Sequence, residues 1–154
     1  MAEVTEWNEL AAAVVRAAPE AIVVAGPDGM IRLWNAGAER MFGYSEAEAT
    51  GASLDLIIPE KLRARHWEGY DKTMATGQTR YGDTLLKVPA THKDGRRMSI
   101  EFSVALLTDA SGAVTGISAV IRDATERFNE ERALRKRLAE LERQAPATAP
   151  ATDA

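Results

Sequence analysis

Three tight turns divide this chain into short apolar segments, and they constrain its fold more than any other feature. The turns are Pro27-Asp28-Gly29, His92-Lys93-Asp94-Gly95 and Asp109-Ala110-Ser111-Gly112. Glycine accepts the positive φ that such turns need, and proline and aspartate favour the positions before it. Each turn lies between segments rich in apolar residues, which is typical of β-hairpins. The turns therefore predict a sheet built mainly from antiparallel neighbours.

Five strands are expected, in two groups separated by short helices. In residues 99–106 the side chains of Ile100, Phe102 and Val104 alternate with polar or small ones, as in a half-buried strand. The longest helix between the groups is expected to begin at Pro59 and to stop before Gly77. This order predicts an α+β fold, in which a five-stranded antiparallel sheet carries short helices on one face. The expected strands are residues 21–26, 30–35, 80–90, 99–106 and 114–122.

Both ends of the chain have the pattern of amphipathic helices. Residues 5–17 have apolar residues at helical spacing, with Thr5 as the expected N-cap and Pro19 just beyond the end. After the sheet, Leu134, Leu138 and Leu141 have the spacing of a coiled-coil seam, over about two heptads. The expected organisation is an N-terminal helix at 1–18, a domain at 19–125, a helix or short coiled coil at 126–144 and a disordered tail at 145–154.

Composition excludes several classes of protein. The net charge of −4 and the pI near 5.3 argue against binding to nucleic acid or to an anionic membrane surface. The longest apolar run, residues 10–15, is too short to span a membrane, and the acidic N-terminus does not resemble a signal peptide. The absence of cysteine excludes disulfides and cysteinyl cofactor adducts. We therefore expect a cytoplasmic protein that binds neither nucleic acid nor membrane.

The sequence also contains no motif that is typical of an enzyme. The sequence contains no Ser/His/Asp arrangement with a supporting motif, no phosphate-binding glycine loop and no kinase, cyclase or phosphodiesterase signature. About thirty residues follow the last strand, fewer than an output enzyme needs. We therefore expect a signalling role to act through a partner or through the chain's own helices.

Several local motifs, in this order, resemble the PAS sensor domain. The resemblance covers residues 18–127 and implies the PAS fold and a role in sensing or protein interaction. Members of this family bind haem, flavins, small acids or nothing, so the ligand has to be argued from the site itself. The motifs are Ala-Ile-Val-Val at 21–24, Ile-Arg-Leu-Trp-Asn at 31–35, Ala-Glu-Arg-Met-Phe-Gly-Tyr at 38–44, Lys-Asp-Gly at 93–95 and Arg-Asp-Ala-Thr-Glu-Arg at 122–127.

His66 resembles the iron ligand of haem-binding PAS domains of the oxygen-sensing FixL type. In those domains the proximal histidine lies in the same helix, and an alignment without gaps from Pro59 to Gly95 places His66 on it. A neutral imidazole is a common axial ligand of haem iron. The resemblance therefore implies haem b as cofactor, His66 as the metal ligand and a diatomic gas or a redox state as the signal.

Residues near His66 on the same helix are candidates for the cofactor site. Helical spacing places Leu62, Gly69 and Tyr70 on the face of His66. Glycine costs about 1 kcal/mol in the interior of a helix. We expect Gly69 to be tolerated because a flat ligand lies close to the backbone there.

The resemblance assigns the distal side of the site to apolar residues. Tyr81, Phe102 and Val104 fall on the family's distal apolar positions, and Leu86 falls where the family has an arginine that binds oxygen. Lys87 is adjacent, but strand alternation directs it to the opposite face. Because the site then has no cationic donor for bound oxygen, carbon monoxide, nitric oxide and redox state are candidates for the signal alongside oxygen.

Two other readings remain open for this site. In one, the domain binds no ligand, His66 is a polar helix residue, and the domain acts in dimerisation or partner docking. In the other, a flavin binds non-covalently, with Trp34 or Trp67 stacked on it, although either side chain is commonly used for packing. A photoreceptor of the LOV type is excluded, because its adduct needs a cysteine. His92 is expected to be exposed to solvent in its turn, without a ligand role.

We also expect a homodimer built on the terminal helices. The alternative is that the apolar stripe of each terminal helix packs on the chain's own sheet, which needs no partner. The N-terminal helix has to contribute, because about two heptads are marginal on their own. The two stripes are Trp7, Leu10 and Val14 at one end and Leu134, Leu138 and Leu141 at the other.

Overall fold

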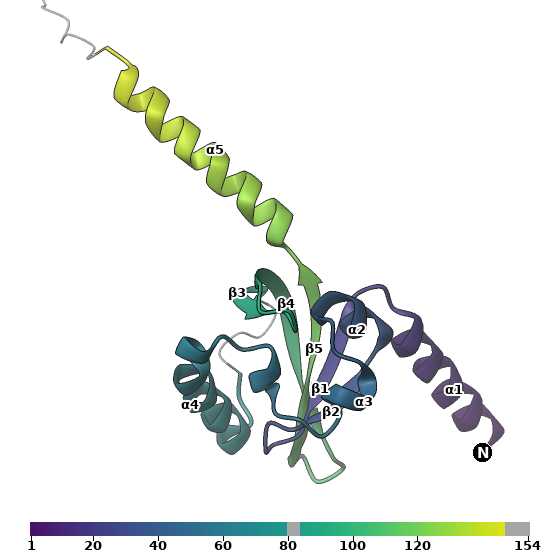
Figure 1. Ribbon diagram of the computed structural model, residues 1–154. Coiled ribbons are helices and arrows are strands. Elements are labelled where there is room, and N and C mark those ends of the chain that lie inside the picture. Colours follow the sequence, from purple (N-terminus) through teal and green to yellow (C-terminus); the bar gives the residue numbers. More distant parts are fainter. Residues whose placement is uncertain (80–83, 147–154) are drawn as a thin grey trace, which may run out of the picture. The chain divides into compact units, whose positions relative to one another are not determined.

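A computed structural model of the protein describes residues 1–79 and 84–146 (Figure 1). Residues 1–124 form one compact unit, and a second unit begins at Thr125. The helices are α1 (Ala2–Ala17), α2 (Ala36–Phe42), α3 (Glu46–Ala49), the short 3₁₀ helix η1 (Leu54–Leu56), α4 (Glu60–Thr76) and α5 (Thr125–Gln144). The strands are β1 (Ala21–Ala25), β2 (Ile31–Trp34), β3 (Leu86–Thr91), β4 (Arg97–Thr108) and β5 (Val114–Asp123).

The five strands form one antiparallel sheet in the order β2-β1-β5-β4-β3, which confirms the predicted fold class. The first hairpin and the later meander join where β1 pairs with β5, with Val23 opposite Ala119. The expected strand at 80–90 begins at Leu86, and part of that range, 80–83, lies outside the described residues. In the described part of the chain, no helix is both long enough and apolar enough to cross a membrane.

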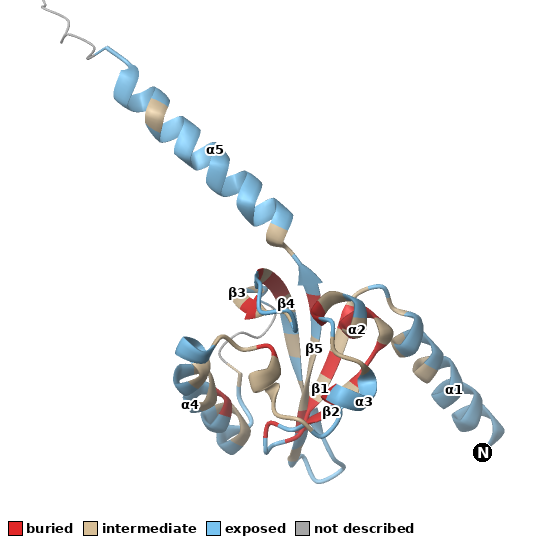
Figure 2. Ribbon diagram, in the orientation of Figure 1, coloured by how far each residue is buried: buried red, intermediate tan, exposed pale blue. Residues whose placement is uncertain are grey.

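Strand register separates an inner face, which carries the core, from an outer face. Ala21, Val23 and Ala25 of β1 point to the inner side and are buried, and α2 and α3 pack on β1 and β2 there. Phe42 and Ile31 are among the largest fully buried side chains. Figure 2 shows buried segments where β1 and β2 lie beside α2 and also on β3 and β4. The core extends across the sheet, because Ala90, Met98, Ile100 and Ile121 of the other strands belong to it as well.

The side-chain amide of Asn35 joins three elements. Its Oδ1 accepts hydrogen bonds from the backbone amides of Ile22 and Ala38, both at 2.9 Å. Its Nδ2 donates to the carbonyl oxygens of Val15 at 2.9 Å and Glu20 at 3.0 Å. Asn35 therefore caps α2 and fixes β1 and the end of α1 to it, with its hydrogen-bonding groups satisfied.

The expected N-cap at Thr5 is wrong, because α1 begins at Ala2. The Thr5 hydroxyl donates to the carbonyl oxygen of Met1 at 3.1 Å, one turn earlier. A threonine side chain can make this bond inside a helix, and it then no longer marks the helix start. The C-terminal end of α1 is as predicted. The helix ends at Ala17, and Ala18, the residue before Pro19, lies outside it.

We predict that Asn35→Ala lowers the free energy of unfolding by about 2 to 4 kcal/mol. The substitution removes a helix cap and leaves the buried amides of Ala38 and Ile22 without their acceptor. Urea denaturation followed by circular dichroism measures the loss. Asn8→Ala, on an exposed position of α1, serves as control and changes the value by less than about 0.5 kcal/mol. A similarly small change for Asn35→Ala would contradict the prediction.

Candidate functional site

The start of α4 is fixed to the preceding turn by Arg63. Its guanidinium donates from Nε to the carbonyl oxygen of Ile58 and from Nη2 to that of Asp55, both at 3.1 Å. The helix closes at Gly77, which has a φ of 65° and donates its amide to the carbonyl oxygen of Thr73 at 2.9 Å. These contacts hold the helix that carries His66 at both ends.

His66 lies in the middle of α4 as a half-buried imidazole. Its ring centroid is 4.8 Å from that of Trp67 and 5.7 Å from that of Tyr70. Its Nδ1 is buried and has no hydrogen-bond partner among the residues that the structure describes. Burial lowers the pKa of His66 below its ordinary value, and the negative charge of Asp55 opposes this shift. The imidazole is therefore neutral near pH 7, the form that binds a metal.

Trp67 and Tyr70 connect α4 to the turn between β1 and β2. The indole of Trp67 donates to Oδ1 of Asp55 at 2.8 Å, and the phenol of Tyr70 donates to the carbonyl oxygen of Gly26 at 2.5 Å. Burial, the largest cause, raises the pKa of Tyr70 to about 12. A Cβ on Gly29 would lie 2.2 Å from the Trp67 ring, so only glycine allows this approach. The two rings thereby fix the surroundings of His66.

The structure groups His66 with different neighbours from those given by helical spacing. Leu62 is 37% exposed, and Gly69 is exposed with open space around the position of a Cβ. Tyr70 is buried and contacts the His66 ring, as expected. Leu62 and Gly69 thus lie on the more exposed side of α4, and their contact with a cofactor stays a prediction. Trp67 contributes to the site through packing, one of the two roles considered for it.

The strand residues of the candidate site lie on the inner face. Leu86 of β3 is directly opposite Phe102 of β4, and Val104 follows two positions later on the same side. All three are half-buried. Lys87 points to the outer face, where its Nζ lies 3.9 Å from Oε1 of Glu101. Tyr81, the remaining predicted contact, lies outside the described residues.

The inner face of β3 and β4 is apolar at each described position. Its residues become less buried toward one end of β4, from Met98 and Ile100, which are buried, to Phe102 and Val104, which are half-buried. In the described chain, α4 makes no extended backbone contact with a strand, whereas α2 and α3 do. The inner-face residues are Leu86, Val88, Ala90, Met98, Ile100, Phe102, Val104 and Leu106.

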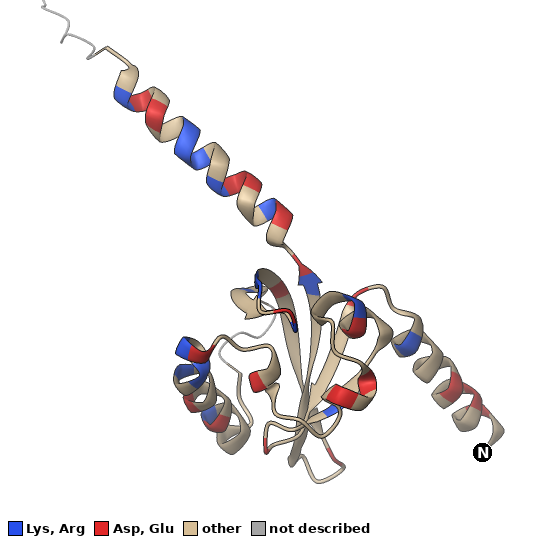
Figure 3. Cartoon of the chain, viewed as in Figure 1, with Lys and Arg blue, Asp and Glu red and all other residues tan. Residues whose placement is uncertain are grey.

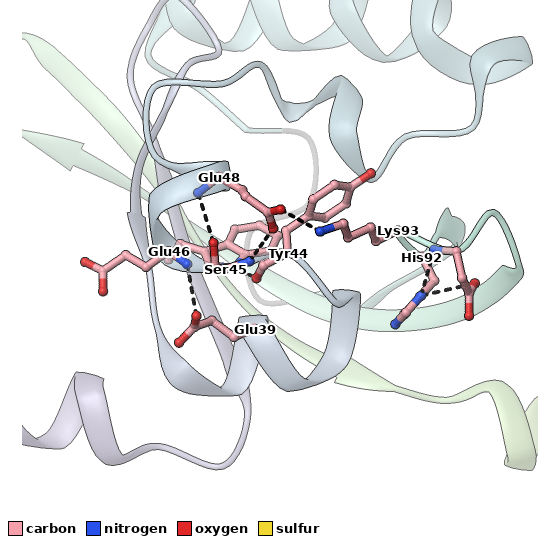
Figure 4. A network of polar contacts seen from close by, with 9 residues as sticks. Glu39, Tyr44, Ser45, Glu46, Glu48, His92 and Lys93 are labelled. Atoms are coloured by element: carbon pink, nitrogen blue, oxygen red, sulfur yellow. Dashed lines mark hydrogen bonds and ion pairs between the residues drawn. The ribbon is translucent and has the colours of Figure 1, made fainter.

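The second histidine belongs to a structural contact between the β3–β4 turn and the corner after α2 (Figure 4). The expectation that His92 is exposed is wrong, since its side chain is only 15% exposed. Its ring lies against Gly43, and its Nδ1 accepts a hydrogen bond from the amide of Asp94 at 3.1 Å. Lys93 pairs with Glu48, which lowers the pKa of that carboxyl. These contacts hold the turn in place, and the His92 ring is part of them.

We predict that His66 makes the stability of the ligand-free protein pH-dependent. Because its pKa is lower in the folded state, the unfolded chain binds more protons as the pH falls below about 6.5. The free energy of unfolding therefore falls from that pH down to the lower, folded pKa. Urea denaturation at about pH 7.5 and about pH 5.5 measures this fall.

The fall in the free energy of unfolding between the two pH values becomes smaller in His66→Gln, because glutamine cannot bind the proton. It remains in the control His92→Gln. An unchanged pH dependence in His66→Gln would show that this imidazole does not titrate differently in the folded state.

Comparisons with known proteins agree with the fold. A profile described as the PAS fold matches residues 15–129. The sensor protein FixL of Bradyrhizobium diazoefficiens is 27% identical over 128 residues, which cover 83% of this chain and 25% of FixL. The oxygen sensor protein DosP of Escherichia coli is 28% identical over 95 residues, which cover 62% of this chain and 12% of DosP. The chain therefore spans a quarter or less of these relatives.

Solved structures show the same fold at lower identity. A PAS domain from Colwellia psychrerythraea has a TM-score of 0.68 and 22% identity, covering 78% of this chain and 98% of its own. An RNA-binding Light-Oxygen-Voltage receptor has a TM-score of 0.70 and 23% identity, covering 92% of this chain and 39% of its own. Because the profile match spans most of the sequence, this chain belongs to the PAS-fold family.

Proposed function

We propose that this PAS sensor domain binds haem b through His66 and responds to a diatomic gas or to the oxidation state of the iron. The observation that carries the proposal is the buried, unpartnered Nδ1 of a neutral imidazole on α4. His66 is also the residue that aligns with the iron ligand of FixL-type haem domains. The names of the two relatives, a sensor protein and an oxygen sensor protein, support a sensing role.

The residues around His66 fit a flat apolar group bound through an imidazole nitrogen. A buried nitrogen without a partner costs about 1 to 3 kcal/mol. A metal bound at Nδ1 would remove this cost, because one ring nitrogen of a neutral histidine binds a metal while the other carries the proton. The half-buried Leu86, Phe102 and Val104 provide apolar surface that a ligand would shield from water.

Each part of the site has a defined task in this proposal. Bound haem supplies an iron atom that accepts a diatomic ligand or changes its charge on oxidation. His66 holds the group on α4, and Trp67 and Tyr70 fix the orientation of the imidazole through their own hydrogen bonds. The apolar side chains of β3 and β4 exclude water. No step requires a catalytic residue.

The composition of the inner face bears on which signal is sensed. Bound oxygen gains from a charged donor, but Leu86 stands where the family's arginine would be, and the Lys87 ammonium lies on the outer face beside Glu101. The domain therefore lacks, in its described strands, the arrangement that favours oxygen. We propose carbon monoxide, nitric oxide and iron redox state as signals on an equal footing with oxygen.

The strand pairing offers a route by which a change at the site reaches a partner. Phe102 is paired with Ile121 and Val104 with Ala119, so a displacement of β4 side chains acts directly on β5. At the end of β5 the amide of Ala124 donates to the carbonyl oxygen of Ser99 at 2.8 Å. We propose that this end of the sheet passes the signal to α5 and, through α5, to a separate output protein.

A ligand-free interaction module is the second candidate function. The observation in its favour is that the Trp67 and Tyr70 rings already pack against His66. A non-covalent flavin is a third candidate, because flavin-type Light-Oxygen-Voltage domains share the fold, although at this identity the likeness concerns the fold alone. The absence of cysteine excludes a cysteinyl flavin adduct.

We predict that the purified protein, supplied with haem, shows a Soret band that shifts with carbon monoxide. In His66→Ala the band weakens to the level of non-specific association, because the axial nitrogen is lost. His92→Ala is the matched control, since His92 is the other histidine of the chain, and it retains the wild-type spectrum. Imidazole added to His66→Gly restores the band, which a purely structural role for His66 would not produce.

Absorption spectroscopy also separates the three candidates. A wild-type protein that stays colourless with added haem, or a His66→Ala protein that retains haem as well as wild type, would overturn the haem proposal. Yellow fluorescence released on denaturation identifies a flavin. A chromophore-free protein whose melting temperature is independent of both additives is the interaction module.

A further inference from the structure

The indole of Trp67 differs from the other indoles of the chain in the group that accepts its hydrogen bond. Its Nε1 donates to the carboxylate oxygen Oδ1 of Asp55 at 2.8 Å. The indole of Trp34 donates to the neutral carbonyl oxygen of Tyr44 at 3.0 Å, and Trp7 is 67% exposed on α1. Trp67 is therefore the tryptophan whose N–H is held by a negative charge.

The same indole lies against the proposed iron ligand. The ring centroids of Trp67 and His66 are 4.8 Å apart, and the ring planes are inclined at 82°. The β1–β2 turn leaves room for the indole because Gly29 has no Cβ. Trp67 is therefore fixed in contact with the imidazole while its N–H is bound to Asp55.

Asp55 is placed to stabilise a positive charge on this indole. A tryptophan that loses one electron keeps its N–H and becomes a cation, so both partners of the hydrogen bond are then charged. Such hydrogen bonds are stronger than neutral ones, and a fixed charge is most effective where new charge develops. The Arg63 guanidinium lies 3.8 Å from the same Asp55 oxygen, but its hydrogen bonds go to the carbonyl oxygens of Ile58 and Asp55. The indole N–H is therefore the hydrogen-bond donor to this oxygen.

We propose that Trp67 supplies one electron when hydrogen peroxide reacts with ferrous haem held by His66, and that Asp55 stabilises the tryptophan cation radical that results. This inference rests on the proposed function, because His66 holds the haem. It adds an activity to that function, the reduction of hydrogen peroxide with a side chain of the domain as one of the electron donors.

The atoms and electrons of this reaction balance. The O–O bond of hydrogen peroxide breaks, and the peroxide takes up two electrons and two protons to give two molecules of water. The iron supplies one electron and becomes ferric, and the indole of Trp67 supplies the other. The protons come from the solvent, because the described inner face of β3 and β4 is apolar. No proton leaves the indole.

The neighbouring Tyr70 is a poorer electron donor than Trp67. Its ring centroid is 5.2 Å from that of Trp67, but its phenol donates to the backbone carbonyl oxygen of Gly26. A phenol that loses an electron also gives up its proton, and a backbone carbonyl is not a base that takes up this proton. Burial, the largest cause, raises the pKa of Tyr70 to about 12, which makes the loss of the proton harder. The radical therefore stays on Trp67.

Electron paramagnetic resonance tests the proposal on the haem-loaded full chain, whose ferrous form is mixed with hydrogen peroxide and frozen. We expect a radical signal that narrows when the chain is made with ring-deuterated tryptophan. Trp67→Phe, which keeps an aromatic ring in place, loses this signal. Trp7→Phe is the matched control and retains it, because Trp7 lies exposed on α1. The Soret band and circular dichroism check the haem and the fold of each variant.

The charge of Asp55 has a test of its own. Asp55→Asn keeps an oxygen acceptor for the indole but removes the charge, and we expect a radical yield at least about threefold lower. Glu68→Gln is the matched control. It removes an equal charge from the exposed residue next to Trp67 on α4, a helix whose charged residues are seen in Figure 3, and it leaves the yield unchanged. An equal yield in Asp55→Asn would overturn the role of Asp55.

A measurement without haem separates this inference from the proposed function. A photo-excited ruthenium complex with an external electron acceptor oxidises tryptophan in the haem-free Trp7→Phe chain, which lacks the exposed indole. We expect Asp55→Asn to lower the radical yield here as well, and an equal yield would contradict the stabilisation by Asp55.

The two proposals fail in different ways. A protein that takes up no haem would overturn the proposed function and, with it, the reaction with peroxide. A haem-loaded protein that forms no tryptophan radical, or a haem-loaded Trp67→Phe protein that still forms one, would overturn this inference and leave the haem site standing.

Discussion

The four hydrogen bonds of Asn35 are the interaction on which the rest of this structure depends. They join the end of α1, the start of β1 and the first turn of α2 through one buried side chain. The chain can pass so closely here only because residue 37 is glycine, since a Cβ there would lie 2.1 Å from the carbonyl oxygen of Glu20. With β1 held in this way, this strand has a fixed position against which β2 and β5 pair.

The two halves of the sheet differ in how completely their inner face is covered. Over β1 and β2, the helices α2 and α3 pack directly on the strands, and the side chains between them, such as Phe42 and Ile31, are fully buried. Over β3 and β4, Leu86, Phe102 and Val104 remain half-buried, and α4 is held through ring contacts with the β1–β2 turn. Met98 and Ile100 of β4 are buried. Because buried apolar contacts stabilise a region, the part of this half around Leu86, Phe102 and Val104 is the one that would adapt to a ligand in the proposed function.

This division gives a physical basis for a sensor built on one domain. The rigid half fixes β1, and β5 pairs with β1 on one side and with β4 on the other. Under the proposed function, a change in the adaptable half would pass across these paired strands while the domain stays folded.

The sequence by itself determined the strands, their turns and the direction of each strand side chain. Alternation with a period of two is local, so it placed Leu86 on the inner face and Lys87 on the outer one, as the structure shows. The sequence also placed His66 in the middle of its helix.

Helical periodicity predicted the neighbours of His66 on α4 less well, because it does not show which side of a helix faces the rest of the fold. Leu62 and Gly69 lie on the exposed side, while Trp67 turns inward to meet Gly29. Only the tertiary structure decided this, and it also packed His92 against Gly43. Both contacts join residues far apart in the sequence and depend on packing that no local pattern records.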